Sequence, residues 1–122
     1  MKKILIIDDD HMMVNALTTL LETENVSIIT SPDGEDGIRL YREHQPHVVL
    51  LDLRLPTKNG IEVLKDIRQI NPRAQVIIIT GYPSLEVREE AMVNGAFHFY
   101  EKSRDVGELL RAVQNAIAAN PT

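Results

Sequence analysis

Short runs of apolar residues alternate with amphipathic segments along this chain, and this alternation restricts the fold more than any other feature of the sequence. Five runs predict strands, at residues 4–7, 26–29, 48–51, 76–79 and 97–100. The first, third and fourth are apolar throughout, which is typical of parallel strands buried on both faces of a sheet. The fifth contains His98, which favours a strand at the edge of the sheet.

The segments between these runs carry apolar residues at helical spacing. Stripes at 13–21, 61–67 and 106–117 predict helices, and weaker patterns predict two more at 34–43 and 84–93. Asp105 and Glu108 resemble a capping box at the start of the last helix. Asn59 is predicted to cap a helix N-terminus, and Gly95 to end a helix.

Strands and helices in strict alternation predict an α/β fold, a doubly wound five-stranded parallel sheet with five helices on its two faces. The length of 122 residues suits one domain, and we expect that domain to span residues 1–122. In such sheets the functional residues gather beyond the carboxyl ends of the strands. The residues at those strand ends are therefore the candidates for chemistry.

Charge and composition exclude several classes of function. Asp and Glu number 18 against 13 Lys and Arg, and this net charge of −5 argues against direct binding of nucleic acid. The chain has no cysteine, which excludes disulfides and thiolate metal sites. The first apolar run ends in acids after four residues, so it predicts neither a signal peptide nor a membrane span. We expect a cytoplasmic protein.

Polar residues follow four of the predicted strands, and the parallel sheet should bring them to one edge. They are Asp8, Asp9 and Asp10 after the first strand, Asp52 after the third, Thr80 after the fourth and Lys102 after the fifth. All but Asp52 have a simple structural interpretation: the three acids would cap a helix, the threonine would sit in a turn and the lysine would be solvated. Asp52 is less easily explained in this way, because it directly follows the apolar run Val-Val-Leu-Leu. Their joint occurrence instead favours a shared site.

Carboxylates packed together repel one another, and one of them stays protonated unless a cation lies nearby. Mg²⁺ prefers oxygen ligands and is often held by one or two carboxylates together with phosphate oxygens. With Lys102 as a second positive charge, such a site would accept a phosphoryl group. A carboxylate within it would serve as the nucleophile and form an aspartyl phosphate.

Four stretches of sequence match a known family in order and spacing. They are Ile-Leu-Ile-Ile-Asp-Asp-Asp at 4–10, Val-Val-Leu-Leu-Asp-Leu-Arg-Leu-Pro-Thr-Lys-Asn-Gly at 48–60, Val-Ile-Ile-Ile-Thr-Gly-Tyr at 76–82 and Asn-Gly-Ala-Phe-His-Phe-Tyr-Glu-Lys at 94–102. On these stretches the chain resembles the receiver domains of response regulators in two-component signalling. The resemblance implies a flavodoxin-like fold with strand order 2-1-3-4-5.

The resemblance also implies roles for the residues at the strand ends. Asp52 matches the aspartate that accepts a phosphoryl group from a sensor histidine kinase. Asp9 would bind Mg²⁺ directly, Asp8 would hold it through a water molecule, and Asp52 and the backbone carbonyl of Arg54 would complete the protein ligands. Such a domain catalyses only its own phosphorylation and dephosphorylation and is not a turnover enzyme.

A second group of implied roles concerns the phosphoryl group and the response to it. Lys102 and Thr80 would contact phosphoryl oxygens, and Phe99 would turn inward when Thr80 moves. The output face would comprise the fourth helix, the fifth strand and the fifth helix. That face would act on an effector domain or protein, and it would also serve a homodimer.

Four positions depart from the family pattern or flank the site, and one of them is Phe99, which lacks the phenolic hydroxyl that a tyrosine would offer there. Ser103 follows Lys102 where family members usually have proline, which leaves the cis or trans state of that bond open, and with it the direction of the lysine. Arg54 and Tyr82 stand two residues beyond Asp52 and Thr80, so they should alter how water reaches an acyl phosphate.

Three other functions are weighed against phosphorylation. A phosphatase of the haloacid-dehalogenase type would need an acid where Arg54 stands, and a flavin carrier would need a phosphate loop where three aspartates stand. The third alternative is a degenerate receiver that acts only as a docking module without phosphorylation, and Ser103 keeps that alternative open.

Overall fold

The computed structural model describes residues 1–23 and 25–119, so residue 24 and the last three residues of the predicted domain lie outside the described part. Within these residues the chain forms five strands and five helices in strict alternation. The strands are β1 (Lys2–Ile7), β2 (Val26–Ser31), β3 (Val48–Asp52), β4 (Val76–Thr80) and β5 (His98–Glu101). The helices are α1 (His11–Leu21), α2 (Gly34–His44), α3 (Gly60–Ile70), α4 (Leu85–Val93) and α5 (Val106–Ala119).

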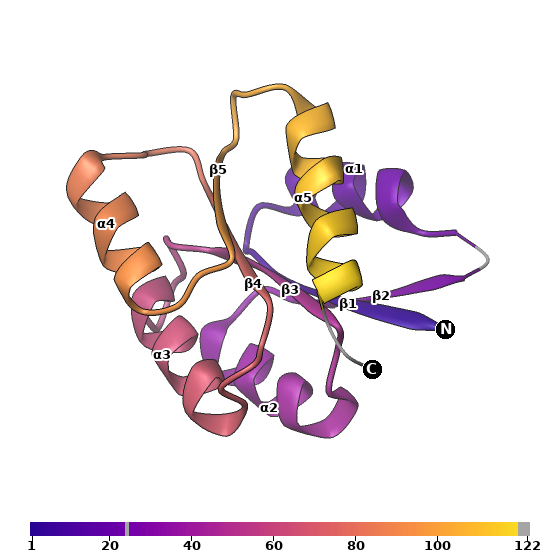
Figure 1. Cartoon of the computed structure of the whole chain (residues 1–122), viewed down its shortest axis with the longest axis horizontal. Coiled ribbons are helices and arrows are strands. Elements are labelled where there is room, and N and C mark those ends of the chain that lie inside the picture. Colours follow the sequence, from indigo (N-terminus) through magenta and orange to yellow (C-terminus); the bar gives the residue numbers. More distant parts are fainter. Residues whose placement is uncertain (24, 120–122) are drawn as a thin grey trace.

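All strand pairs are parallel, and the sheet order is β2-β1-β3-β4-β5. This confirms the doubly wound α/β fold and the flavodoxin-like strand order. Helices α1 and α5 cover one face of the sheet, while α2, α3 and α4 cover the other (Figure 1). Each face has its own apolar core, and successive residues of β1 alternate between them: Ile4 and Ile6 face α1 and α5, and Leu5 and Ile7 face the other layer.

The predicted boundaries are close to the observed ones, and the differences arise from backbone pairing. Strand β1 begins at Lys2, because Lys2 pairs with Val26 although its side chain is charged. Strand β5 begins at His98, one residue later than predicted, where His98 pairs with Ile77. Asn59 caps α3, with its side chain accepting a hydrogen bond from the Ile61 amide at 2.7 Å, as predicted.

The predictions for two other helix ends, the end of α4 and the start of α5, had different outcomes. Gly95 follows α4 with a φ of +93°, a conformation that glycine adopts readily, which confirms it as the end of that helix. At α5 the capping box is only half formed. Asp105 accepts a hydrogen bond from the Gly107 amide, but the Glu108 carboxylate lies against His98 and Arg104 instead of turning back to Asp105.

Helix α4 is the least anchored of the described helices, in agreement with its weak sequence pattern. Ala91 is the one buried residue among those of Leu85–Val93, and Leu85 and Val93 are exposed. None of the helices formed by the described residues has the length and apolar character needed to cross a bilayer.

Candidate functional site

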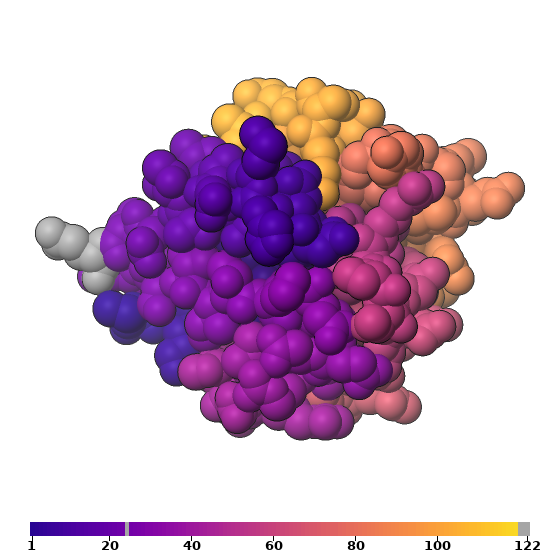
Figure 2. Space-filling view, turned by 180° about the vertical axis from the view of Figure 1, so that it is seen from behind, coloured from indigo at the N-terminus to yellow at the C-terminus, as the bar shows by residue number. Residues whose placement is uncertain are grey.

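The carboxyl edge of the sheet gathers the polar residues that the sequence placed at its strand ends. Asp52 and Thr80 are the last residues of β3 and β4, and Lys102 directly follows β5. The Lys102 amide donates to the Thr80 carbonyl oxygen at 2.8 Å, so the main chain at this lysine is tied to the end of β4. In Figure 2 the surfaces coloured indigo, magenta, orange and yellow adjoin in the upper half of the view, although these segments are far apart in the sequence.

The three consecutive aspartates have three different environments. Asp8 is 2% exposed, and its Oδ1 accepts a hydrogen bond from the Asp10 amide at 2.9 Å. Asp9 is exposed, and Asp10 caps α1 by accepting from the Met13 amide at 3.2 Å. The helix-capping interpretation is therefore right for Asp10, while Asp8 and Asp9 remain candidates for members of a shared site.

Asp8, Asp9 and Asp52 each offer a carboxylate oxygen, and these oxygens all lie within 4.8 Å of one another. The Oδ2 atom of Asp8 is buried and accepts no hydrogen bond, although it lies 3.1 Å from the Lys102 ammonium nitrogen. A buried carboxylate oxygen without a hydrogen bond has capacity for a further cationic partner. This donor set, made of oxygens alone, fits the preference of Mg²⁺.

Lys102 points into this group of acids. Its Nζ lies 3.1 Å from Asp8 Oδ2, 3.4 Å from Asp52 Oδ2 and 4.0 Å from Asp10 Oδ2. No peptide bond within the described residues is cis, so the bond between Lys102 and Ser103 is trans. The replacement of the family's usual proline by serine therefore does not turn the lysine away from the acids.

The pKa values of the site follow from burial and from charge. The pKa of Asp52 is raised to about 6: burial is the largest cause, the negative charge of the neighbouring Asp8 acts in the same direction, and the hydrogen bond from the Arg54 amide and the charge of Lys102 act in the opposite direction. For Lys102, burial lowers the pKa, but the contacts with Asp8 and Asp52 outweigh it and the net shift is upward. Lys102 is thus a stable cation beside a carboxyl that holds its proton unusually well.

Thr80 and Arg54 lie beside the acids. Thr80 is 1% exposed, and its Oγ1 accepts a hydrogen bond from the Tyr82 amide at 3.1 Å. The Arg54 amide donates to Asp52 Oδ1 at 3.2 Å. The Arg54 guanidinium lies over the Tyr82 ring, 3.9 Å from its centroid, and so joins the β3–α3 and β4–α4 loops. The sequence indicated that both residues flank the site, but not that they stack.

Gly60 allows the start of α3 to pack against the chain that carries Asp52. A Cβ atom at Gly60 would lie 2.5 Å from the Leu53 Cα and 2.6 Å from the Asp52 carbonyl oxygen. Both of those atoms belong to the backbone and cannot move aside cheaply. The glycine therefore helps fix the position of the central acid of the site.

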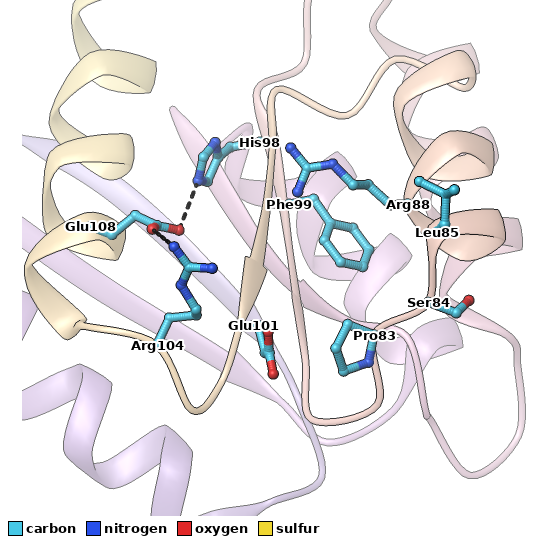
Figure 3. A pocket seen from close by; sticks show the side chains of 9 residues that line it. All are labelled: Pro83, Ser84, Leu85, Arg88, His98, Phe99, Glu101, Arg104 and Glu108. Carbon is cyan, nitrogen blue, oxygen red and sulfur yellow. Dashed lines mark hydrogen bonds and ion pairs between the residues drawn. The ribbon is translucent and has the colours of Figure 1, made fainter.

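Phe99 lies on β5 with its side chain toward α4 and is 5% exposed. It lines a cavity of about 460 Å³ between α4, β5 and α5, together with Pro83, Leu85, Arg88 and residues of the α5 side (Figure 3). The Arg88 guanidinium lies 5.8 Å from the centroid of its ring. The aromatic predicted to act as a switch thus lines this cavity together with residues of the β4–α4 segment.

The profile of the response regulator receiver domain family matches residues 4–114. This chain belongs to that family. Receiver domains are signalling modules and not metabolic enzymes, which agrees with the expected class. Among curated relatives, the regulatory protein AtoC of Escherichia coli is 34% identical over 115 residues, which are 94% of this chain and 25% of that protein. The chain therefore spans about a quarter of AtoC.

Two further comparisons cover most of both chains. The sporulation initiation phosphotransferase F of Bacillus subtilis is 31% identical over 113 residues, 93% of this chain and 91% of that protein. A complex of CheX with CheY, BeF3 and Mg²⁺ from Borrelia burgdorferi matches with a TM-score of 0.87 and 30% identity, over 93% of this chain and 87% of the matched chain.

The raised pKa of Asp52 predicts an unusual pH dependence of stability when no divalent cation is bound. A carboxyl whose pKa rises on folding stabilises the protein most at pH values below its ordinary pKa of 3.8. This contribution is lost as the pH rises through about 6. Relative to Asp52→Asn, the wild-type free energy of unfolding should therefore fall by about 2 kcal/mol between pH 4 and pH 7. Urea unfolding in the presence of a chelator measures this difference.

Asp36→Asn is the matched control for this measurement. Hydrogen bonds from Arg39 and Ser31 lower the pKa of Asp36, so its contribution is present at neutral pH and is lost as the pH falls. The two substitutions should give slopes of opposite sign. A difference between wild type and Asp52→Asn that stays constant from pH 4 to pH 7 would contradict the electrostatic description of the site.

Proposed function

We propose that this chain takes a phosphoryl group onto Asp52, in a reaction that depends on Mg²⁺, from the phosphohistidine of a sensor histidine kinase in the cytoplasm. The observation that carries the proposal is the position of the Lys102 ammonium, within 3.4 Å of both Asp8 and Asp52 at the edge where three carboxylates meet. Positive charge beside a buried carboxylate is what transfer of an anionic group to that carboxylate requires.

Each residue of the acidic group has a part in this proposal. A carboxylate oxygen of Asp52 attacks phosphorus and forms the new P–O bond, while the P–N bond breaks and its electron pair stays on the donor imidazole, which takes a proton. Asp9, Asp52 and the carbonyl of Arg54 would hold Mg²⁺, with Asp8 acting through a water molecule. When bound, the ion supplies positive charge to the phosphoryl oxygens.

Lys102 and Thr80 would bind the transferred group. The Lys102 ammonium needs little movement to leave Asp52 and pair with a phosphoryl oxygen on it, because its Nζ already lies 3.4 Å from the Asp52 carboxylate. The Thr80 hydroxyl accepts the Tyr82 amide in this structure, so its own hydrogen can be donated to a phosphoryl oxygen.

The output of the site would run through Thr80 and Phe99 to the face formed by α4, β5 and α5. Phosphorylation would favour one of two arrangements of this region, and the small buried part of α4 makes rearrangement inexpensive. The cavity lined by Phe99, Arg88 and Leu85 lies on this face and would take part in contact with an effector or with a second copy of the chain (Figure 3).

A degenerate receiver that only docks is not favoured. Such a domain would be expected to lack a member of the site, yet the acids, Thr80 and Lys102 all lie at the same edge of this sheet. Ser103 kept that alternative open in the sequence, and the trans bond before it leaves Lys102 directed at the acids.

The direct test is incubation with acetyl phosphate and Mg²⁺, followed by intact mass measurement. We expect wild type to gain one phosphoryl group, because the P–O bond to acetate can break as Asp52 attacks. Asp52→Asn should gain none, a chelator should abolish the gain, and Asp36→Asn should behave like wild type. Absence of any labelling of wild type would refute the proposal and favour the docking module.

The stack of Arg54 on Tyr82 should govern how long the acyl phosphate lasts. The pair lies beside Asp52 and Thr80, so we expect it to limit the access of water to them. Loss of a contact worth about 1 kcal/mol should speed hydrolysis about fivefold. We expect Arg54→Ala and Tyr82→Ala each to shorten the lifetime of the phosphorylated state, measured by mass after removal of the donor.

The double variant and a remote arginine serve as controls for that experiment. If the two side chains act as one stack, Arg54→Ala combined with Tyr82→Ala should be no faster than either alone. Arg39→Ala, which breaks exposed ion pairs on α2, should leave the lifetime unchanged. Lifetimes equal to wild type in both single variants would rule out this role for the stack.

A further inference from the structure

The direction of Lys102 depends on a short turn, because the lysine lies where β5 has ended and α5 has not yet begun. Its amide is tied to the Thr80 carbonyl oxygen at 2.8 Å, which fixes the chain on the strand side. On the other side of the lysine is Ser103, whose φ angle is less restricted than that of a proline at this position. Something else must therefore hold the chain beyond the lysine if the ammonium is to stay at the acids.

The turn is closed by contacts on that far side. The Arg104 amide donates to the Glu101 carbonyl oxygen at 2.9 Å, which brackets Lys102 and Ser103 in a single turn. The Tyr100 hydroxyl donates to the Arg104 carbonyl oxygen at 2.7 Å. Ser103 adds an exposed bond to the Glu101 carboxylate at 3.0 Å. Arg104, which closes the turn, is thus held in place by a hydrogen bond from the Tyr100 hydroxyl in the protein interior.

Tyr100 is well suited to act as a fixed support. Its side chain is 2% exposed and belongs to the core between the sheet and the α1 and α5 layer, with Leu109 and Val113 of α5 in the same cluster. A ring packed in this way has little freedom, so its hydroxyl defines a position in space. Burial, together with the charges of Glu108 and Asp105, raises the pKa of Tyr100, so the hydroxyl remains a donor at neutral pH.

We propose that Tyr100 is a positioning residue for phosphorylation: its hydroxyl holds the turn of residues 101–104 in the shape that keeps the Lys102 ammonium between Asp8 and Asp52. Tyr100 acts through Lys102 and does not touch the phosphoryl group. The inference rests on the proposed function, because it concerns how the cation of that site is aimed.

Tyr100→Phe removes one oxygen atom and keeps the ring, so it tests the hydroxyl alone. A hydrogen bond of ordinary strength corresponds to about a fivefold change in a rate that depends on it. We expect labelling by acetyl phosphate at saturating Mg²⁺ to be about fivefold slower in Tyr100→Phe than in wild type. Near-ultraviolet circular dichroism checks that the variant keeps its tertiary packing, and rates are expressed per folded molecule.

Tyr41→Phe is a matched control on the opposite face of the sheet. Tyr41 is 3% exposed, belongs to the other core, and its hydroxyl accepts a hydrogen bond from the Asn71 amide group at 3.2 Å. It undergoes the same chemical change far from the turn. Both variants should melt a few degrees below wild type, but Tyr41→Phe should be labelled at the wild-type rate.

A double-variant cycle with Lys102→Ala separates positioning from general stability. If Tyr100 acts through the lysine, Tyr100→Phe should slow labelling in the wild-type background and have no further effect once Lys102→Ala is present. A Tyr100→Phe rate equal to wild type, an equal loss in Tyr41→Phe, or the same loss with and without Lys102 would each overturn the inference.

The outcomes distinguish this inference from the function on which it rests. If wild type is not labelled at Asp52, the proposed function fails and the positioning role fails with it. If wild type is labelled but Tyr100→Phe matches it, the proposed function stands and only the role of Tyr100 is refuted.

Discussion

The ion contacts of Lys102 with Asp8 and Asp52 are the interaction on which the rest of this site depends. Two buried carboxylates lie against one ammonium, at 3.1 Å and 3.4 Å, so one negative charge remains uncompensated. This imbalance is consistent with the raised pKa of Asp52 and with the Asp8 oxygen that accepts no hydrogen bond. A site of this kind gains from a divalent cation, and with the cation bound its net charge suits an incoming phosphoryl anion.

The parallel sheet supplies the convergence that this chemistry needs. Asp52 and Lys102 are 50 residues apart in the sequence, yet the pairing of β3 with β4 and of β4 with β5 places them at one edge. The continuous apolar strands stabilise this arrangement because both faces of the sheet are buried. Polar groups are therefore found at the strand ends. Gly60 and the Tyr100 hydroxyl then fix the backbone on either side of the site.

The sequence predicted the helices and strands and their alternation well, because apolar periodicity reports directly on burial, whereas the strand order within the sheet was implied by the family resemblance. It could not separate Asp8, Asp9 and Asp10, since their different roles depend on the direction in which each side chain leaves the end of β1. The stack of Arg54 on Tyr82 and the bond from Tyr100 to Arg104 were also beyond prediction. Both depend on loop conformations that leave no periodic signal. A buried tyrosine hydroxyl usually finds a hydrogen-bond partner, but the sequence does not tell which group that partner is.

The most direct test of the central claim is the thermal stability of wild type with and without Mg²⁺ at pH 8, which is well above the raised pKa of about 6 at Asp52. Mg²⁺ at ten times its dissociation constant should stabilise the folded protein by about 1.4 kcal/mol, a rise of several degrees in Tm. Asp9→Asn should lose most of that rise, because it removes an acid of the proposed metal site without burying a new group. An unchanged Tm for wild type across millimolar Mg²⁺ would contradict the account.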